Sequence, residues 1–326
     1  GAGISRCTGP GTALSCYNDV ACSASWADSD ARAVGQISFI SGGGCFICTG
    51  ALLNRDPSDN NLLFMTANHC ISTRAEAATL EVRWLYQTDS CGGTLPGFND
   101  VPRSNGAVLL KRRSSADWTL LGLVERPGGL FQLGWRSASW SSGESATGVH
   151  HPAGTRKRIS FGTSDGSTSN ATFCDQNGQN CFDADVWDIA YASGTTQGGS
   201  SGSPIFDPDR RVRGTLTGGP SGCAPITKRY GRLDLAYTNL RYFLFTDYIA
   251  SPVIVNGGFG GDAGNNGSTE RGTVINPFNE VREAIYAVRA SDTVLIQPGN
   301  YNEQFLVTRP MALERLGSSG SVLIGQ

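Results

Sequence analysis

A serine that could act as a nucleophile lies in a glycine-rich turn, Gln197-Gly-Gly-Ser-Ser-Gly-Ser-Pro204. Gly199 and Gly202 permit positive φ angles and a close approach of the backbone to a ligand. In such a turn the hydroxyl of Ser201 is exposed beside backbone N–H groups, which suits a covalent nucleophile next to an oxyanion hole. A glycine- and serine-rich surface loop is the alternative, and the octapeptide by itself leaves both interpretations open.

A serine hydroxyl becomes a good nucleophile when a base, usually histidine, accepts its proton. The chain has three histidines, His69, His150 and His151. His69 follows an apolar, strand-like run and lies in the segment Thr-Ala-x-His-Cys, in which Cys70 offers a covalent anchor. This context favours a catalytic base over a histidine of the hydrophobic core. We expect His150 and His151, at the end of another strand-like segment, to support a loop or to line the cleft.

The imidazole in turn needs a buried carboxylate that fixes its tautomer and stabilises the imidazolium. Asp117 is the best candidate, because it directly precedes the apolar run Trp-Thr-Leu-Leu and a buried aspartate is costly unless it is paired. Asp185 and Asp188 are the alternatives; they alternate along one short segment and could instead face solvent. We therefore predict a catalytic triad of His69, Asp117 and Ser201.

The order histidine, aspartate, serine along the chain is that of chymotrypsin and differs from the orders in subtilisin and the α/β-hydrolases. The segments Thr-Ala-x-His-Cys, Asp-Trp-Thr-Leu-Leu and Gly-Ser-Ser-Gly-Ser-Pro resemble the three signatures of trypsin-like serine proteases. More narrowly, residues 4 to 248 resemble the secreted bacterial lysyl endopeptidases. Further segments that carry this resemblance are Cys16-Tyr-Asn-Asp-Val-Ala-Cys22, Cys48-Thr-Gly-Ala-Leu-Leu-Asn54, His150-His-Pro152, Arg211-Val-Arg-Gly-Thr-Leu-Thr-Gly-Gly-Pro220 and Tyr230-Gly-Arg232.

The resemblance implies an all-β, chymotrypsin-like fold of two six-stranded antiparallel barrels, with the catalytic residues at their junction. Short strand-like segments separated by turns recur from Gln36 to Leu235, which is itself typical of a barrel or a sandwich. An aromatic-rich segment, Leu240 to Ala250, could form a helix that closes this domain. The resemblance also implies peptide-bond hydrolysis through an acyl-enzyme, with the N–H groups of Gly199 and Ser201 as the oxyanion hole.

Two positions depart from the patterns of these families. Trypsins carry an aspartate directly before the nucleophile, which pairs with a newly freed N-terminus on activation. Here that residue is Ser200, so this ion-pair switch is absent. Lysyl endopeptidases bind the substrate lysine with an aspartate two residues before Tyr-Gly-Arg, and here that residue is Lys228. We therefore expect a primary specificity other than lysine.

The residues expected at the primary specificity pocket are Thr195 at its base, Thr217, Gly218 and Gly219 along its wall, and Lys228. Two outcomes remain open. If Lys228 points inward, the enzyme should prefer an acidic residue before the scissile bond. If Lys228 points outward, the pocket is neutral and favours small or polar residues.

The chain has ten cysteines, and this even number indicates an oxidising compartment. A metal site is not expected, because Cys45 and Cys48 have no second Cys-x-x-Cys pair at zinc-finger spacing, and no cofactor is predicted. The resemblance implies the disulfides Cys16–Cys223, Cys22–Cys91 and Cys48–Cys70. The four remaining cysteines could pair as Cys174–Cys181, which closes a small polar loop, and as Cys7–Cys45.

The formal net charge is −2, without a dense basic run, which argues against nucleic acid as the main partner. No apolar stretch reaches the length of a membrane span. The first residue is glycine, and no charged-then-apolar leader follows it. We expect a secreted, mature bacterial protein from which a signal and a pro-segment have been removed, acting as a monomer on protein or peptide substrates.

The composition changes after residue 250. Residues 251–270 are rich in glycine and asparagine and indicate a linker. Within residues 271–326 a helical pattern follows, with Asn276 as its cap and Pro277 in its first turn. The apolar face of this predicted helix comprises Phe278, Val281, Ile285 and Val288.

The segment Asp-Thr-Val-Leu-Ile-x-Pro-Gly-x-Tyr-x-Glu, which begins at Asp292, resembles the entry of right-handed parallel β-helix domains. The expected organisation is thus a protease domain over 1–250, a linker over 251–270 and a β-helix-like segment over 271–326. Two other functions stay open: a catalytically inactive, protease-like binding protein, and a carbohydrate-associated protein acting through the C-terminal segment. That segment lacks the acidic clusters of a calcium-dependent lyase and has room for about two coils, fewer than a solenoid needs.

Overall fold

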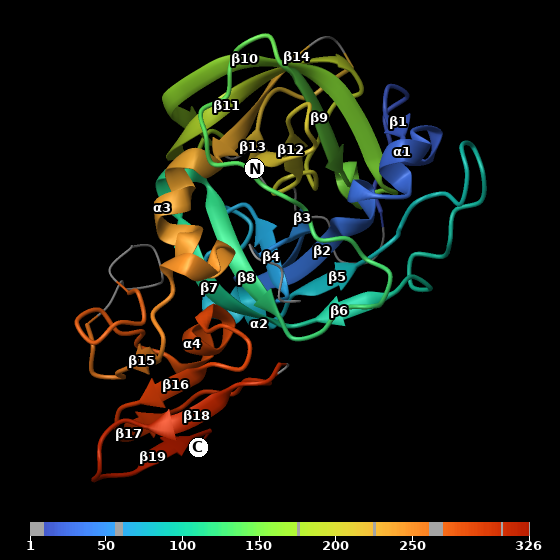
Figure 1. Ribbon diagram of the computed structural model, residues 1–326. Helices are drawn as coiled ribbons and strands as arrows, with labels where there is room; N and C mark the ends of the chain where they lie inside the picture. Colours follow the sequence, from blue (N-terminus) through green and yellow to red (C-terminus); the bar gives the residue numbers. More distant parts are fainter. Residues whose placement is uncertain are drawn as a thin grey trace.

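Two antiparallel sheets are followed by a smaller structure of parallel strands (Figure 1). A computed structural model describes residues 10–55, 61–174, 177–223, 226–260, 270–307 and 309–325. Short helical segments connect the strands of the two sheets. They are η1 (Val20–Cys22), α1 (Ala24–Ala27), η2 (Asp30–Ala33), α2 (Arg74–Ala78), η3 (Ser114–Ala116) and η4 (Pro152–Gly154).

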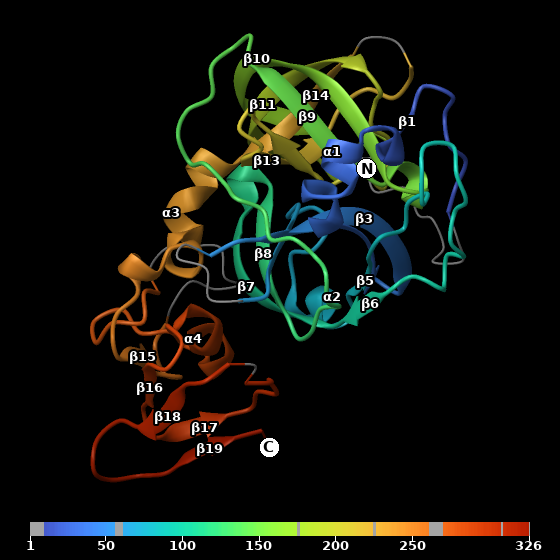
Figure 2. The ribbon, with the colours of Figure 1, turned by 45° about the vertical axis from the view of Figure 1, so that its right-hand side comes forward.

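The first sheet has seven strands in the order β6-β5-β2-β3-β4-β8-β7. It curls without closing, and α2 contacts both β2 and β7 (Figure 2). A capping box between Thr73 and Glu76 starts this helix. The strands are β2 (Val34–Ser41), β3 (Gly44–Leu53), β4 (Leu63–Thr66), β5 (Glu81–Arg83), β6 (Arg103–Asn105), β7 (Ala107–Arg113) and β8 (Trp118–Leu123).

The second sheet closes on itself. Its strands follow the order β9-β10-β11-β14-β13-β12, and β12 pairs back with β9, while the two-residue strand β1 (Asn18–Asp19) pairs with β10. The expected chymotrypsin-like fold is thus confirmed. Of the two six-stranded barrels expected, only the second is closed with six strands. The first is a half-barrel of seven strands, because its edge strands β6 and β7 do not pair. The strands are β9 (Ser145–His150), β10 (Arg158–Phe173), β11 (Phe182–Ser193), β12 (Pro204–Phe206), β13 (Val212–Gly218) and β14 (Ile226–Arg232).

The helix expected over Leu240–Ala250 starts earlier than predicted. The helix α3 (Leu233–Leu244) begins directly after β14, and the short turn η5 (Thr246–Tyr248) follows it. An Arg232–Asp234 ion pair lies at the start of α3, where the helix dipole favours an acidic residue. Its buried side chains recur at helical spacing and pack into the main hydrophobic core.

The C-terminal segment consists of stacked parallel strands and one helix. Strands β15 (Val253–Val255), β16 (Thr293–Ile296) and β18 (Ala312–Arg315) form one parallel sheet, and β17 (Gly299–Tyr301) pairs in parallel with β19 (Val322–Ile324). This is the β-helix-like arrangement expected from the sequence. Strand β15 lies within the range expected to be a linker, and residues 261–269 of that range lie outside the described residues.

The helix of this segment begins later than the sequence pattern predicts. Helix α4 covers Val281–Ala287, and Asn276 does not cap it. Phe278 cannot be helical, because its N–H donates to Ile254 O and its carbonyl accepts from Asn256 N, which extends the pairing of β15. The Glu303 carboxylate, 22 residues further along, accepts from Val281 N at 2.9 Å and replaces the local cap.

The C-terminal segment is packed against the half-barrel and shares its hydrophobic core. The ring of buried Tyr286 covers Gly122 on β8, and its hydroxyl donates to Leu123 O at 2.9 Å. Fully buried Arg55, after β3, donates to the carbonyls of Tyr286, Ala287 and Val288, which are among the unpaired acceptors at the end of α4. The contacts of Tyr286 cover the end of β8, a strand that is buried along its whole length.

Four disulfides link the described residues, and they match four of the expected pairs. They are Cys16–Cys223, Cys22–Cys91, Cys48–Cys70 and Cys174–Cys181. The fifth expected pair, Cys7–Cys45, depends on Cys7, which lies outside the described residues. Among the helices described, none combines the length and the hydrophobicity that spanning a membrane requires.

We predict that Tyr286→Ala lowers the free energy of unfolding by about 3–5 kcal/mol, the usual effect of truncating a buried aromatic ring. The substitution also leaves Gly122 uncovered and Leu123 O unpaired. Tyr286→Phe, which removes only the hydroxyl, should lower it by about 1 kcal/mol. Urea denaturation followed by tryptophan fluorescence measures both effects. The control is Phe131→Ala, because that ring is 45% exposed; an equal loss in the control would contradict the prediction.

Candidate active site

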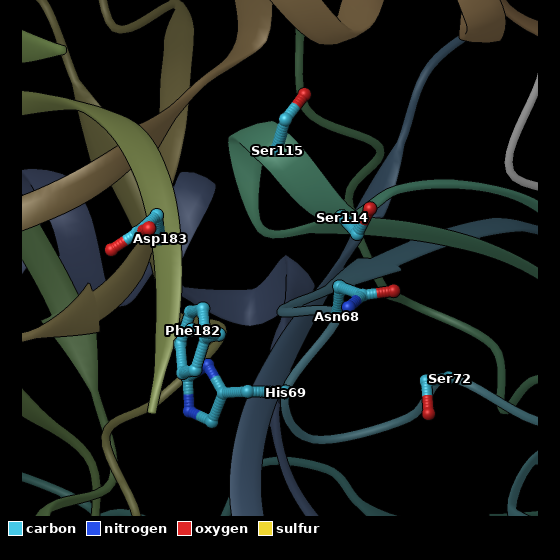
Figure 3. A pocket seen from close by; sticks show the side chains of 7 residues that line it. All are labelled: Asn68, His69, Ser72, Ser114, Ser115, Phe182 and Asp183. Atoms are coloured by element: carbon cyan, nitrogen blue, oxygen red, sulfur yellow. The ribbon is translucent and has the colours of Figure 1, made fainter. Parts of the chain in front are cut away.

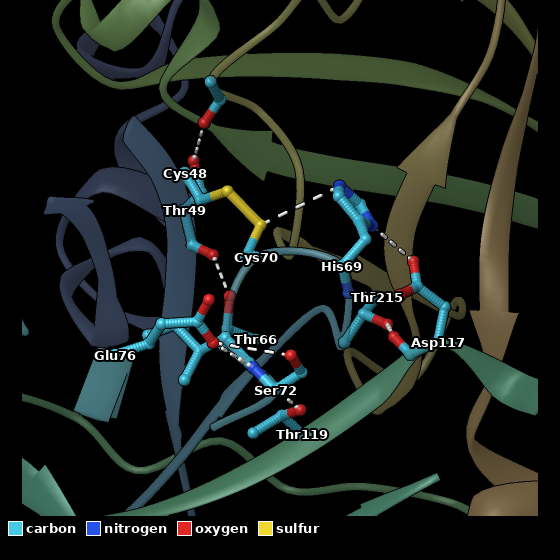
Figure 4. Close-up of a disulfide and its surroundings, with 12 residues drawn as sticks. Cys48, Thr49, Thr66, His69, Cys70, Ser72, Glu76, Asp117, Thr119 and Thr215 are labelled. Atoms are coloured by element: carbon cyan, nitrogen blue, oxygen red, sulfur yellow. Dashed lines mark hydrogen bonds and ion pairs between the residues drawn. A yellow bond between two sulfur atoms is a disulfide. The ribbon is translucent and has the colours of Figure 1, made fainter. Parts of the chain in front are cut away.

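His69 and Asp117 are joined by a direct hydrogen bond. The distance between His69 Nδ1 and Asp117 Oδ2 is 2.8 Å, and the backbone N–H of His69 donates to Asp117 Oδ1 at 2.8 Å (Figure 4). The carboxylate is fully buried and the imidazole is 12% exposed. One carboxylate therefore holds both the ring and the backbone of the histidine.

Local backbone geometry places each member of this pair. His69 lies in the turn after the buried strand β4. Asp117 lies between η3 and β8 with φ +50°, in the left-handed region that aspartate tolerates. Its carbonyl accepts from Thr215 Oγ1 on β13 at 3.0 Å, so the second barrel also holds this residue. The two alternative aspartates have other partners. Asp185 accepts from the backbone N–H of Asn170, and Asp188 accepts from the side chains of Thr168 and Arg229.

The turn that carries Ser201 is fastened to the half-barrel. Thr49 on β3 donates from its N–H to Ser201 O and from its hydroxyl to Gly199 O, both at 2.8 Å. Gly202 has φ +81°, and a Cβ on it would lie 2.3 Å from Thr66 Oγ1 and 2.8 Å from Ala67 N. Only glycine fits here, because the turn touches the residues that lead into His69.

Ser201 is connected to the His69–Asp117 pair through its backbone rather than through its hydroxyl. The Cys48–Cys70 disulfide links β3, next to Thr49, with the residue that follows His69. Ser201 is half-buried, and its Oγ makes no hydrogen bond with His69 Nε2 among the described residues. Catalytic hydrogen bonds are often long in proteins without substrate and shorten on binding.

Two backbone N–H groups, those of Gly199 and Ser201, have no acceptor among the described residues. Ala153 N donates to Gly198 O at 2.6 Å, and because C=O and N–H of one peptide point in opposite directions, the N–H of Gly199 points away from Ala153. Within the described ranges neither Gly199 N nor Ser201 N donates to a protein acceptor. The residues expected at the oxyanion hole therefore carry free donors, as such a site requires.

His150 and His151 are buried and support loops, one of the two roles expected for them; His150 contacts the Ser201 turn, and the His151 ring bonds to the loop that follows β9. His150 Nδ1 lies 2.9 Å from Ser200 Oγ, and its Nε2 lies 3.0 Å from Ser160 Oγ. Burial, with a smaller effect of Lys228, lowers the pKa of His150 to about 3. Burial also lowers the pKa of His151 well below its ordinary value, and its Nδ1 bonds to Thr155 O at 2.9 Å. Both rings are therefore neutral at neutral pH.

A cleft with a volume of about 400 Å³ lies on one side of His69. The Phe182 ring stacks on the imidazole with a centroid distance of 5.7 Å (Figure 3). Sequence reasoning missed Phe182, which begins β11 directly after the Cys174–Cys181 loop and carries no local motif. The cleft is lined by Asn68, His69, Ser72, Ser114, Ser115, Phe182 and Asp183.

The residues expected at the specificity pocket lie around the end of β13 and the loop before Ser201. Lys228 on β14 is 1% exposed and bonds through Nζ to Thr196 O. The side chains of Thr195 and Thr217 are buried, and neither hydroxyl has a hydrogen-bond partner in the part of the chain that the structure describes. Gly218 is covered by the Phe173 ring, which lies 3.3 Å from its ideal Cβ position, and Gly219 has φ +142°. Within the described ranges, no three His, Cys, Asp or Glu side chains lie close enough together to hold a metal ion.

Comparison with known proteins relates the chain to one family. The profile of the family described as "Lysyl endopeptidase, C-terminal domain" matches residues 10–232. A lysyl endopeptidase of Pseudomonas aeruginosa is 35% identical over 242 residues, which cover 68% of this chain and 49% of the relative. The secreted RxLR effector protein 73 of Plasmopara viticola is 34% identical over 168 residues, 50% of this chain and 39% of that protein. The chain thus spans about half the length, or less, of these curated relatives.

Solved structures of proteases also resemble the chain at low sequence identity. The active form of the Rv3671c protease from M. tuberculosis aligns with a TM-score of 0.47 and 15% identity, covering 72% of this chain and 92% of that chain. The HtrA-type protease AlgW with a tripeptide aligns with a TM-score of 0.46 and 17% identity, covering 68% of this chain and 63% of that chain. Because the family profile covers most of both barrels and includes His69, Asp117 and Ser201, the chain belongs to the lysyl endopeptidase family.

Proposed function

We propose that this chain is a trypsin-like serine endopeptidase in which Ser201 is the nucleophile, His69 the general base and Asp117 the carboxylate that orients the base. The observation that carries the proposal is the 2.8 Å hydrogen bond between His69 Nδ1 and the buried Asp117 Oδ2. A buried carboxylate at this position keeps the proton on Nδ1, so the lone pair of Nε2 is free to accept a proton.

In the proposed reaction, Ser201 Oγ attacks the peptide carbonyl carbon while His69 Nε2 takes its proton. The tetrahedral intermediate collapses, the C–N bond breaks, and His69 returns the proton to the leaving amine. Water then attacks the acyl-enzyme with His69 again as base, which releases the acid and restores the Ser201 hydroxyl. Asp117 stays ionised and stabilises the imidazolium in both steps.

The proposed oxyanion hole consists of the N–H groups of Gly199 and Ser201. Both donors are without a partner among the described residues, and the bond from Ala153 N to Gly198 O orients the first of them. Such preorganised donors stabilise the charge that develops on the carbonyl oxygen, since they need no rearrangement when the charge appears.

Ser200 and His150 take the place of the ion pair that fixes this turn in trypsins. Ser200 Oγ accepts from Gln197 N at 3.3 Å and bonds to His150 Nδ1 at 2.9 Å. A neutral contact between two buried side chains needs no newly freed N-terminus. We therefore assign His150 and Ser200 as positioning residues of the oxyanion turn.

The four disulfides among the described residues support secretion into an oxidising compartment, as does the similarity to a relative named as a secreted effector protein. Two rival functions have less support. An inactive, protease-like binding protein has no need of the buried Asp117–His69 pair, which is costly to bury. A carbohydrate-associated role would rest on the C-terminal segment, and that segment buries its helix against the half-barrel.

The catalytic assignment predicts that a fluorophosphonate labels the native chain covalently at Ser201. Ser201→Ala and His69→Ala should each lower kcat by roughly 10⁶-fold, because members of a triad act as a unit. Asp117→Asn should lower it by about 10⁴-fold, since the imidazole then takes the wrong tautomer. Ser142→Ala, at an exposed site, is the control and should retain activity. Absence of labelling in the folded native chain would favour the inactive protein.

The positioning assignment predicts that Ser200→Ala lowers kcat about tenfold, from loss of one buried hydrogen bond near the oxyanion hole, with little change in KM. The effect of His150→Asn should be similar. A double-mutant cycle separates this role from a general loss of packing, because the double variant should be no worse than the more impaired single variant. Two results would contradict the assignment. One is a double variant whose loss of kcat equals the combined losses of the two single variants. The other is a change in KM and a lower melting temperature that accompany the loss of kcat.

A further inference from the structure

Lys228 is a buried cation without a partner of opposite charge. The residue is 1% exposed, and its Nζ donates to Thr196 O at 3.1 Å and to Pro220 O. Among the described residues no carboxylate forms an ion pair with it. Burying an ammonium group beside carbonyl dipoles alone is costly, so such groups are normally paired with an anion.

The carboxylate of Asp188, one register position away, is on the other face of the sheet. Lys228 pairs with Ile189 across β14 and β11, and the next pair along is Arg229 with Asp188. Successive side chains of a strand point to opposite faces, and Asp188 is bonded to Arg229 at 3.1 Å. Asp188 is thus paired with Arg229 on the opposite face of the sheet and does not neutralise Lys228.

The ammonium group lies between two segments that border the proposed nucleophile. Thr196 lies five residues before Ser201 in the same loop, and Pro220 follows the glycines at the end of β13. A Cβ on Gly219 would lie 3.1 Å from Lys228 Cδ, so the aliphatic part of the lysine runs against this glycine. The side chain is therefore buried between these two segments, which supports the inward orientation, one of the two alternatives left open by the sequence.

Two further polar groups lie on the same two segments. The hydroxyls of Thr195 and Thr217 are buried and have no hydrogen-bond partner among the residues described. Buried hydroxyls are nearly always satisfied by protein, water or a ligand. Each can donate one hydrogen bond, and a lysine ammonium has three N–H donors, of which two are used here.

This arrangement, taken together with the proposed function on which it rests, leads us to propose that Lys228 selects substrates with glutamate or aspartate before the scissile bond. The side-chain carboxylate of that residue accepts the remaining N–H of Lys228 and the hydroxyls of Thr195 and Thr217. It supplies the negative charge that the buried ammonium lacks. A substrate lysine is rejected, because it would bring a second cation to the same place.

The charge of the site follows from its titratable groups. Burial lowers the pKa of Lys228 to about 8. The group that faces it from β9 is His150, whose pKa of about 3 leaves it neutral, while Asp188 and Arg229 lie on the opposite face of the sheet. The lowered pKa means that the lysine is cationic below about pH 8 and loses its charge above it.

The test compares kcat/KM for peptides that differ only in the residue before the scissile bond: glutamate, aspartate, glutamine, alanine or lysine. Fluorophosphonate titration gives the concentration of active sites. We expect the better of the two acidic peptides to exceed glutamine by at least about tenfold and lysine to be the poorest. In the Lys228→Met variant, kcat/KM for the acidic peptide should be lower and should be about equal to kcat/KM for the glutamine peptide. Arg229→Met, the neighbouring cation on the other face, should keep the native ratio.

A pH profile of the native chain tests the same charge without a substitution. Above about pH 8, kcat/KM for the acidic peptide should fall while that for the glutamine peptide stays level. Labelling of Ser201 with no acidic preference, or efficient cleavage after lysine, would overturn this inference and leave the proposed function intact. Absence of labelling would overturn both.

Discussion

The buried hydrogen bond between Asp117 and His69 is the interaction around which the two barrels are organised. A carboxylate with no exposure must be paired, and here one oxygen holds the imidazole and the other holds the backbone of the same residue. The carbonyl of Asp117 accepts from Thr215, so the same residue ties β8 to the closed barrel. The proposed chemistry and the packing of the two barrels therefore depend on the same buried carboxylate.

The Ser201 turn meets this pair through backbone contacts rather than through its own side chain. Thr49 bonds to Ser201 and Gly199, and the Cys48–Cys70 disulfide links the same strand to the histidine turn. A neutral contact between His150 and Ser200 holds the turn from its other side. Because these contacts are internal to the folded chain, the proposed oxyanion hole needs no ion pair with a terminal amine.

Several buried polar groups on this chain are satisfied by residues far along the sequence. Arg55 bonds to the carbonyls at the end of α4, and Tyr286 bonds to Leu123. Lys228 uses the carbonyls of Thr196 and Pro220 in the same way, but its positive charge has no partner there. The difference between a satisfied hydrogen bond and an uncompensated charge is what separates a structural residue from a candidate for substrate recognition.

The sequence alone determined the class of fold, the residues proposed for the triad and four of the disulfide pairs, because short motifs in tight turns encode them and because they resemble one family. The tertiary structure decided the direction of Lys228, the stacking of Phe182 on His69 and the start of α4 at Val281. Each of these depends on a partner distant in sequence: a carbonyl 32 residues away, a ring across the cleft, and a carboxylate 22 residues further along. Such contacts form only when distant parts of the chain come together in the folded protein, so no local pattern predicts them.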